Sequence, residues 1–275
     1  MNRRTPASTA GKAIGVVVLM SLSLFPFYWM VSTAVDTSPL SRGASLLPSG
    51  FTLDHFRYVL VDAGFLRYVR VSVIVAVGTV VLSAIVALLA AVAVARFRFR
   101  LRTQVLIMVL MVQMVPLEAL VIPLFLQARN LQMLNSLLGL IIVYLGFSLA
   151  FAIWNLRGFV AAVPRELEEA AYIDGASWFR MFRSVLLPLV APGLVATSVF
   201  SFITAWNEFI FALTFMQDSS KYTVGVGLRT FFTQNTADWG SVMAASTIIT
   251  LPVVIFFVLV QRNLAKGMTA GAVKG

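Results

Sequence analysis

The sequence predicts an all-α protein whose helices cross a membrane six times. Hydrophobic residues make up 60% of its 275 residues and charged residues only 12%, and the mean hydropathy is +0.92. Because a soluble domain carries about 25% charged residues, a chain this apolar could not cover itself with a polar surface in water. Its apolar residues also gather into runs of about 20, the length at which a helix crosses the hydrocarbon core of a bilayer.

The first span is predicted at 13–34, after a basic segment at 1–12. A cleaved signal peptide also begins with a basic segment, but its apolar region is usually about 7–15 residues long. Since the run at 13–34 is longer, we interpret it as an uncleaved membrane helix.

Five further apolar runs complete the set of predicted spans. They lie at 69–95, 103–126, 137–156, 190–215 and 241–260. Their polarity does not alternate along the chain as it does in the strands of a membrane barrel, so we predict helices. Prolines at positions 116, 123, 192 and 252 mark expected kinks.

The lysine and arginine residues predict which side of the membrane each connection faces, because cytoplasmic connections hold the excess positive charge. If the N-terminus is cytoplasmic, the inner segments hold 14 of the 21 basic residues and the outer segments hold 7. The strongest contribution comes from the four arginines between positions 96 and 102. We therefore predict that both termini are cytoplasmic. The net charge of +10 then reflects topology, and no nucleic-acid partner is predicted.

Two outer connections, 36–68 and 216–240, are longer than tight turns. Thr52 is placed to cap a short surface helix in the first of them, and the second is polar and contains Gly225 and Gly227. Long loops serve either as decoration or as a surface that contacts a partner. The composition leaves both interpretations open.

Polar groups inside the predicted spans are candidates for function, because charge in the hydrocarbon core is costly and usually faces a cavity or a partner. They either line a path for a substrate or make the hydrogen bonds that fix one helix to the next. Both interpretations stay open. The candidates are Gln113, Glu118, Trp206, Asn207 and Glu208.

The connection 163–188 predicts a helix-turn-helix on the cytoplasmic side. Pro164 suits the first position of a helix, and acidic residues follow in the first turns, where the helix dipole favours them. Gly175 predicts a left-handed stop, and Ser177 begins a second short helix that Pro188 ends. From these residues alone, the segment either docks on another protein or anchors the bundle at the membrane surface.

The same connection resembles the EAA loop of bacterial ABC-importer permeases. The matching residues are Glu169, Ala170, Ala171, Asp174, Gly175, Leu187 and Pro188, with Val185 where that loop usually has isoleucine. Similar stretches occur at 122–125, 205–209 and 266–275, so the resemblance covers nearly the whole chain. The pattern Glu-Ala-Ala-x-x-Asp-Gly-Ala, followed by Leu-Pro-Leu, is similar to the carbohydrate-uptake branch, the MalG-like permeases that depend on a binding protein.

The resemblance implies the fold of the MetI- and MalG-like permeases in the cytoplasmic membrane of a bacterium. It implies that the EAA loop is a coupling helix, which docks on a separate ATPase and receives the motion that switches the membrane helices between inward- and outward-facing states. The implied docking residues are Glu169, Ala170, Ala171, Asp174, Gly175, Leu187 and Pro188. The residues implied to contact the ATPases through the tail are Lys266, Gly267, Thr269 and Gly271.

The resemblance also implies a set of partners. These are a second, MalF-like permease, two copies of an ABC ATPase that bind ATP and magnesium, an extracytoplasmic sugar-binding protein probed by the outer loop 216–240, and membrane lipid. The implied organisation is a cytoplasmic segment at 1–12, a membrane domain at 13–265 that includes the coupling loop 163–188, and a cytoplasmic tail at 266–275.

Catalysis is not predicted for this chain. It lacks cysteine, has a single histidine, His55, and contains no G-x-x-x-x-G-K-[ST] loop to hold a nucleotide. No cofactor or metal site is therefore expected. The expected function is the permease subunit of a sugar or oligosaccharide importer. An importer of glycerol phosphate or a polyol stays open, and a secondary transporter is less favoured because the spans show no internal repeat.

Overall fold

The structure is a computed structural model that describes the backbone of residues 6–43, 45–232 and 238–271, and the side chains of residues 12–43, 45–232 and 238–261. Its described residues form helices and no sheet, with one isolated bridge between Asp36 and Phe51, so the all-α prediction is confirmed. The chain divides into two compact units. One unit comprises Met1–Leu66 and Leu228–Leu251, and the other comprises Arg67–Gly227 and Pro252–Gly275.

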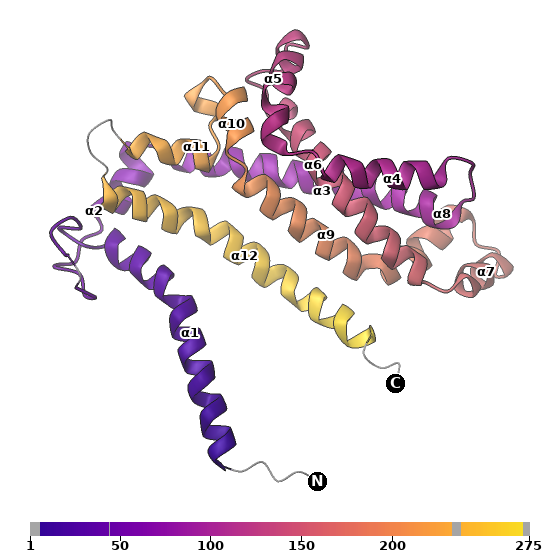
Figure 1. The fold of residues 1–275 in the computed structure, drawn as a ribbon, viewed down its shortest axis with the longest axis horizontal. Coiled ribbons are helices and arrows are strands. Elements are labelled where there is room, and N and C mark those ends of the chain that lie inside the picture. Colours follow the sequence, from indigo (N-terminus) through magenta and orange to yellow (C-terminus); the bar gives the residue numbers. More distant parts are fainter. Residues whose placement is uncertain (1–5, 44, 233–237, 272–275) are drawn as a thin grey trace. The chain divides into compact units, whose positions relative to one another are not determined.

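Within the described residues, five helices are long and apolar enough to cross a membrane. They coincide with five of the six predicted spans and extend beyond most of the predicted boundaries (Figure 1). They are α1 (Pro6–Ala34), α3 (Leu66–Arg96), α6 (Leu137–Ala162), the run of α8 (Trp178–Met181), η3 (Phe182–Leu186) and α9 (Leu187–Asn207), and α12 (Trp239–Gly271).

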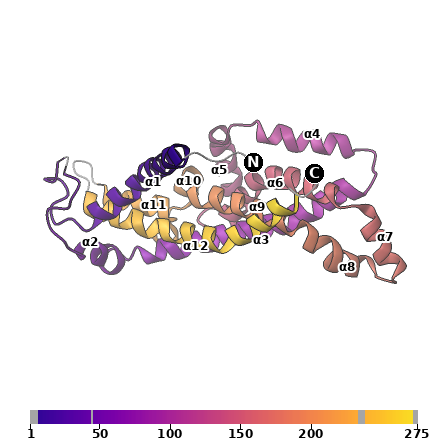
Figure 2. The same cartoon turned by 90° about the horizontal axis from the view of Figure 1, so that it is seen from below.

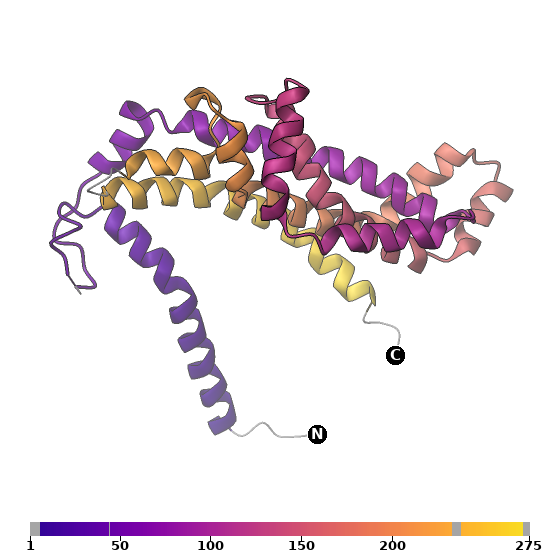
Figure 3. The same cartoon turned by 45° about the horizontal axis from the view of Figure 1, so that its top comes forward.

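The remaining predicted span, 103–126, is not one straight helix. The chain bends by 94° between α4 (Arg102–Gln113) and the helix formed by η2 (Leu117–Leu120) and α5 (Val121–Asn130), and Figure 3 shows the two magenta segments running in different directions. Pro116 causes the break because it has no N–H and disfavours a helical residue before it. The kink expected at Pro116 is therefore present, and the predicted span 103–126 corresponds to this bent pair of helices.

The fifth predicted span, 190–215, is also interrupted. α9 begins earlier than predicted and ends at Asn207, and a separate helix, α10 (Ile210–Phe215), follows. Glu208 separates the two helices with an extended backbone, at ψ 129°. The expected end of this span at residue 215 is therefore wrong.

Both predicted outer loops contain helical turns. The first holds α2 (Asp54–Arg57) and η1 (Tyr58–Asp62), and the second holds η4 (Ser219–Lys221), α11 (Val224–Leu228) and η5 (Arg229–Phe231). The Thr52 hydroxyl accepts the Asp54 N–H at 3.1 Å, next to the short helix expected there.

In the first unit, buried Asp36 organises the segment that follows α1. Its carboxylate accepts the N–H of Ser38 at 3.0 Å and both the N–H and the hydroxyl of Ser49. The Arg42 guanidinium lies 3.8 Å from the same carboxylate and 4.3 Å from the ring of Trp29. Burial raises the pKa of Asp36, but these donors together outweigh burial and hold the pKa below its ordinary value. The segment is thereby fastened to the end of α1.

In the second unit, α3 presents a stripe of small buried residues to its neighbours. Small residues let membrane helices approach closely and exchange hydrogen bonds. The hydroxyls of Ser83 on α3 and Ser201 on α9 lie 3.2 Å apart in the interior. The buried small residues of the stripe are Ser72, Ala76, Thr79, Ser83, Ala87, Ala91 and Ala95.

Aromatic contacts continue this packing around α9. The rings of Phe151 on α6 and Phe200 on α9 lie 3.9 Å apart between centroids, and Phe202 stacks on Phe256 of α12 at 4.1 Å. α9 is therefore packed against α3, α6 and the second half of α12 within this unit.

A closely packed glycine gives the first testable prediction. A Cβ at Gly193 on α9 would lie 2.4 Å from ring atoms of Phe159 on α6, whereas one at Gly158, the neighbour of Phe159, would meet no atom within 4 Å. Because overpacking costs about 1–3 kcal/mol, we expect Gly193→Ala to lower the melting temperature of the purified protein. We expect Gly158→Ala to leave it unchanged or slightly raised, since alanine favours a helix by about 1 kcal/mol. Equal melting temperatures for the two variants would contradict this packing.

Candidate functional site

The predicted coupling loop forms a helical hairpin at one end of the second unit (Figures 1 and 2). Its first helix, α7 (Arg165–Ile173), starts one residue after Pro164, which precedes the helix instead of beginning it. Gly175 has φ +80°, the left-handed conformation that the sequence predicts. The N–H of Gly175 bonds to the Tyr172 carbonyl and the N–H of Ala176 to the Ala171 carbonyl, so a Schellman turn ends α7.

The second part of the hairpin differs from the prediction. The Ser177 hydroxyl accepts the Arg180 N–H and caps α8 as expected, but Pro188 does not end the helix. A π turn over η3 precedes Pro188, with the Leu187 N–H bonded to the Phe182 carbonyl. Pro188 then falls in the first turn of α9, where its missing N–H is tolerated. The second arm of the hairpin, α8, therefore continues through η3 into α9 as one helix.

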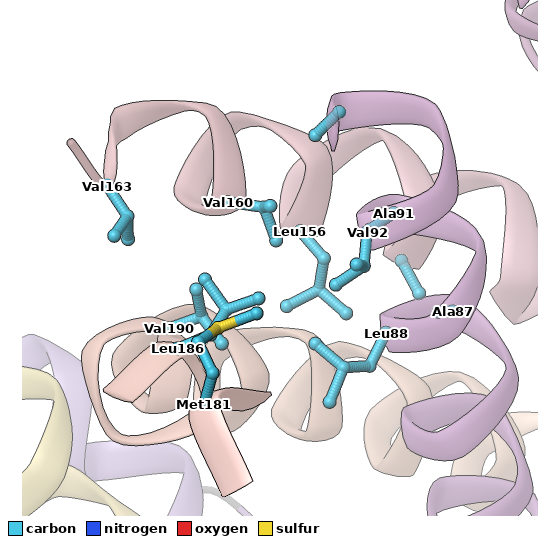
Figure 4. Packing of buried hydrophobic residues seen from close by; sticks show 12 residues of the cluster. Ala87, Leu88, Ala91, Val92, Leu156, Val160, Val163, Met181, Leu186 and Val190 are labelled. Atoms are coloured by element: carbon cyan, nitrogen blue, oxygen red, sulfur yellow. The ribbon is translucent and has the colours of Figure 1, made fainter. Parts of the chain in front are cut away.

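An apolar core supports the hairpin. Side chains of α3, of α6 and of the helix from α8 to α9 converge on one cluster, which Figure 4 shows. Ala171 and Leu187 pack against this cluster and are half-buried, so we interpret these two predicted docking residues as packing residues. The cluster comprises Ala87, Leu88, Ala91, Val92, Ala95, Ala152, Leu156, Val160, Val163, Met181, Leu186 and Val190.

The opposite side of the hairpin is exposed and partly apolar. Glu169, Ala170, Asp174 and Gly175 are exposed, as the docking prediction requires, and Pro188 is exposed on α9. Large apolar side chains lie among them: Ile173 is 86% exposed, Phe179 64%, Trp178 45%, and Tyr172 and Leu167 44% each. Exposed apolar groups gathered at one end of a folded unit mark an interaction surface.

A small cavity of about 240 Å³ lies between the two arms of the hairpin. Ala171 and Ala176 leave the space, and Asp174, Arg180 and Ser184 supply polar groups at its wall. The hairpin therefore carries a small notch with both charged and apolar walls.

A pair of charges that the site prediction missed ties α7 to α3. The Arg96 Nε donates to Glu168 Oε1 at 2.6 Å, and its Nη2 donates to the Val163 carbonyl at 2.9 Å. Both charged side chains are 11% exposed. The residues are 72 positions apart, so only the arrangement of the helices brings them together. The sequence signal was weak: an arginine at the end of a span and a glutamate in a first helical turn.

The residues predicted to contact the ATPases through the tail belong to the end of α12. The backbone of Lys266, Gly267, Thr269 and Gly271 continues this helix, beyond the candidate membrane span at Trp239–Gln261, which agrees with the predicted span 241–260. Their side chains, and residues 272–275 altogether, lie outside the described residues.

The five candidate path residues do not form one polar site. Gln113 ends α4, Glu118 is exposed on η2, and Asn207 is exposed at the end of α9. Trp206 is 4% exposed and stacks on Phe202 with centroids 5.4 Å apart. Among the described residues, no hydrogen bond joins Gln113 or Glu118 to the other three.

The Glu208 carboxyl group accepts three hydrogen bonds within the protein. It accepts the Phe211 N–H at 3.0 Å and the Ala212 N–H at 3.1 Å, which are two of the unpaired donors at the start of α10. The Tyr144 hydroxyl of α6 donates to it at 2.6 Å. This arrangement favours the interpretation in which Glu208 fixes one helix to another.

The cavity beside Gln113 is mostly apolar. It measures about 500 Å³ and is bounded by α4, η2, α5, α6 and α9. Its polar side chains are Gln113 and Thr204, and the rest of the wall includes Val112, Phe147 and Phe151. Sugars bind through many hydrogen bonds, so this cavity is poorly suited to hold one.

Comparison with known proteins adds independent information. Residues 83–270 match the family described as binding-protein-dependent transport system inner membrane component. The chain is 42% identical over 264 residues to the diacetylchitobiose uptake system permease protein DasC of Streptomyces coelicolor, a match that covers 95% of this chain and 96% of that protein. It is 38% identical over 265 residues to the trehalose/maltose transport system permease protein MalG of Thermococcus litoralis, which covers 95% of each chain.

A solved structure shares the fold. It is the crystal structure of a bacterial ABC transporter involved in the import of the acidic polysaccharide alginate. One of its chains matches with a TM-score of 0.80 and 23% identity, over 95% of this chain and 99% of that one.

Proposed function

Because the chain belongs to the family of binding-protein-dependent transport system inner membrane components, we propose that it is the permease subunit of an ATP-driven importer for an oligosaccharide-type sugar. The resemblance found in the sequence is confirmed by these relatives, and the chain is a multi-pass protein of the cell membrane. The proposed importer also contains a second, MalF-like permease, two ATPase subunits that bind ATP and magnesium, and a sugar-binding protein on the outer side.

The proposed coupling role depends on the exposed end of the hairpin that contains α7. An interfacial helix that only anchors a bundle carries lysine and arginine on its polar side, facing anionic lipid. The exposed charged side chains between residues 165 and 174 are one arginine and three acidic residues, and Ile173 is 86% exposed. An acidic surface with a projecting apolar tip favours a protein partner over lipid. We infer that Glu169, Ala170, Asp174 and Gly175 contact the ATPase.

The packing below the hairpin supports a route for the motion. A force on α7 meets the core that joins α3, α6 and α9, and α8 continues into α9 without interruption. Closely packed elements move as bodies and do not deform continuously. ATP-driven movement of the hairpin is therefore proposed to tilt these three helices together, between states open to either side of the membrane.

The substrate class follows from the relatives. The similar proteins are named for the uptake of diacetylchitobiose and of trehalose or maltose, so we propose an oligosaccharide for this chain. The polar groups seen here do not assemble a sugar site, because Glu208 is engaged by Tyr144 and by α10. We propose that the main sugar contacts come from the partner permease and the binding protein, with Gln113, Glu118, Trp206 and Asn207 as the remaining candidates in this chain.

Reconstitution tests this function. The chain is purified with its partner permease and ATPase, placed in proteoliposomes, and supplied with the binding protein and with labelled maltose, trehalose or diacetylchitobiose. We expect sugar uptake that requires ATP inside the vesicles and a sugar-dependent rise in ATP hydrolysis. Uptake that persists without ATP and collapses with the proton gradient would show a secondary transporter instead. Uptake of glycerol phosphate or a polyol, with none of the sugars, would overturn the substrate class.

A further inference from the structure

Two neighbouring glutamates of α7 lie in opposite environments. Glu168 is shielded and faces the bundle, whereas Glu169 is exposed. Successive residues of an α-helix are about 100° apart around its axis, since one turn takes about 3.6 residues. Holding Glu168 on the bundle therefore fixes the rotation of the helix about its own axis and turns Glu169 outward. The partner of Glu168 thus determines which side of α7 faces away from the bundle.

That partner is Arg96, the last residue of α3, and it makes two bonds to different parts of the hairpin. Its Nε donates to Glu168 at 2.6 Å, and its Nη2 donates to the carbonyl of Val163, the C-cap residue of α6. In return, the Arg165 Nη2 reaches the Arg96 carbonyl at 3.4 Å. One guanidinium therefore joins the end of α3, the end of α6 and the start of α7.

The other three arginines between positions 96 and 102 have different surroundings. Arg98 and Arg100 are exposed, and Arg102 is half-buried at the start of α4. Positive charge on this side needs no fixed partner to set topology, so Arg98 and Arg100 account for that role. Arg96 is distinguished by its shielding and by its fork geometry, which a lysine, with its compact point charge, cannot reproduce.

We propose that Arg96 and Glu168 form a positioning pair, which fixes the rotation of α7 and links it to α3. The pair thereby sets how efficiently ATP hydrolysis drives transport. This inference rests on the proposed function, because it assumes that α7 docks on an ATPase. No short stretch of backbone links α3 to α7, because Arg96 and Glu168 are 72 positions apart. The pair therefore provides a polar link between the two helices. Loss of the pair is expected to let α7 turn while leaving the apolar core in place.

The test uses the complete reconstituted importer, with Glu168→Gln, Arg96→Lys and Arg98→Lys. We expect Glu168→Gln and Arg96→Lys to reduce sugar-stimulated ATP hydrolysis and the sugar transported per ATP by about tenfold, within the range by which residues along a coupling route alter it. Basal hydrolysis, copurification of the ATPase and melting temperature should stay near the wild-type values. Arg98→Lys, the same change at an exposed arginine, should behave as wild type.

A charge-reversed double variant, Arg96→Glu with Glu168→Arg, addresses the pair directly. We expect it to recover part of the sugar-stimulated ATP hydrolysis that each single reversal loses. The double variant again places opposite charges together, with the two residues exchanged. Wild-type stimulation in Glu168→Gln would overturn the proposal. So would a parallel loss of stimulation, ATPase copurification and melting temperature, which indicates a structural role only. If the wild-type complex shows no sugar-stimulated hydrolysis, the proposed function itself fails, and that result is distinct from failure of the pair.

Discussion

Replacing Gly175 with aspartate is expected to abolish sugar-stimulated ATP hydrolysis while the protein still inserts and folds. A Cβ at this position would meet no atom of the chain within 4 Å, and although any side chain at φ +80° strains the turn, aspartate is among the few residues that adopt a positive φ. Beyond the strain that asparagine would share, we expect its charge to act on a docked partner. An uncompensated charge buried at that contact is expected to reduce stimulation by about a hundredfold.

Asparagine at the same position is the matched control. It has nearly the same size as aspartate and adopts the left-handed conformation at least as readily, but it carries no charge. We expect Gly175→Asn to lose less stimulation than Gly175→Asp, with equal membrane yield and melting temperature for both. Full stimulation in the aspartate variant would show that the turn does not contact the ATPase. A lowered melting temperature in both variants would attribute the loss to the fold of the hairpin.

The sequence predicted the hairpin well because its signals are local. Gly175, Ser177 and the acidic first turns act within a few residues, through backbone conformation and caps, and the structure confirms the first two. The prediction at Pro188 was wrong because a π turn immediately before it shifts the hydrogen-bond register. A turn of this kind has no clear sequence pattern, so a proline inside an apolar run could not reveal whether the helix would stop or continue.

The long-range features of the site were less predictable. Hydrophobicity predicts that a segment enters the membrane, but it does not predict where the helix breaks within that segment. Pro116 predicted a kink but not a bend as large as 94°, and nothing in the apolar run predicted the interruption at Glu208. The Arg96 to Glu168 contact depends on how α3 and α7 meet. The positive-inside rule already explained Arg96, and the helix dipole already explained Glu168. Neither residue therefore predicted the other as its partner.

Replacing Glu208 with alanine is expected to destabilise the membrane bundle and to impair transport without dissociating the complex. The change leaves the Phe211 and Ala212 N–H groups and the Tyr144 hydroxyl without their acceptor. Donors left unsatisfied out of water cost about 1–3 kcal/mol each, so we expect a loss of about 3 kcal/mol after partial compensation. Thermal unfolding of the purified complex measures this loss, and uptake in proteoliposomes measures transport.

Tyr144→Phe separates the two interpretations of Glu208. It removes one donor and keeps the ring, so a helix-fixing role predicts a smaller fall in stability, about 1 kcal/mol, with a proportionate fall in uptake. A substrate-path role predicts a different pattern: Glu208→Ala would raise the KM for the sugar while the melting temperature stays at the wild-type value, and Tyr144→Phe would leave stability unchanged. Normal uptake by an assembled Glu208→Ala complex would contradict both roles. Because Glu208 joins α6 to the start of α10 at the point where the fifth span is broken, we expect stability and transport to fall together.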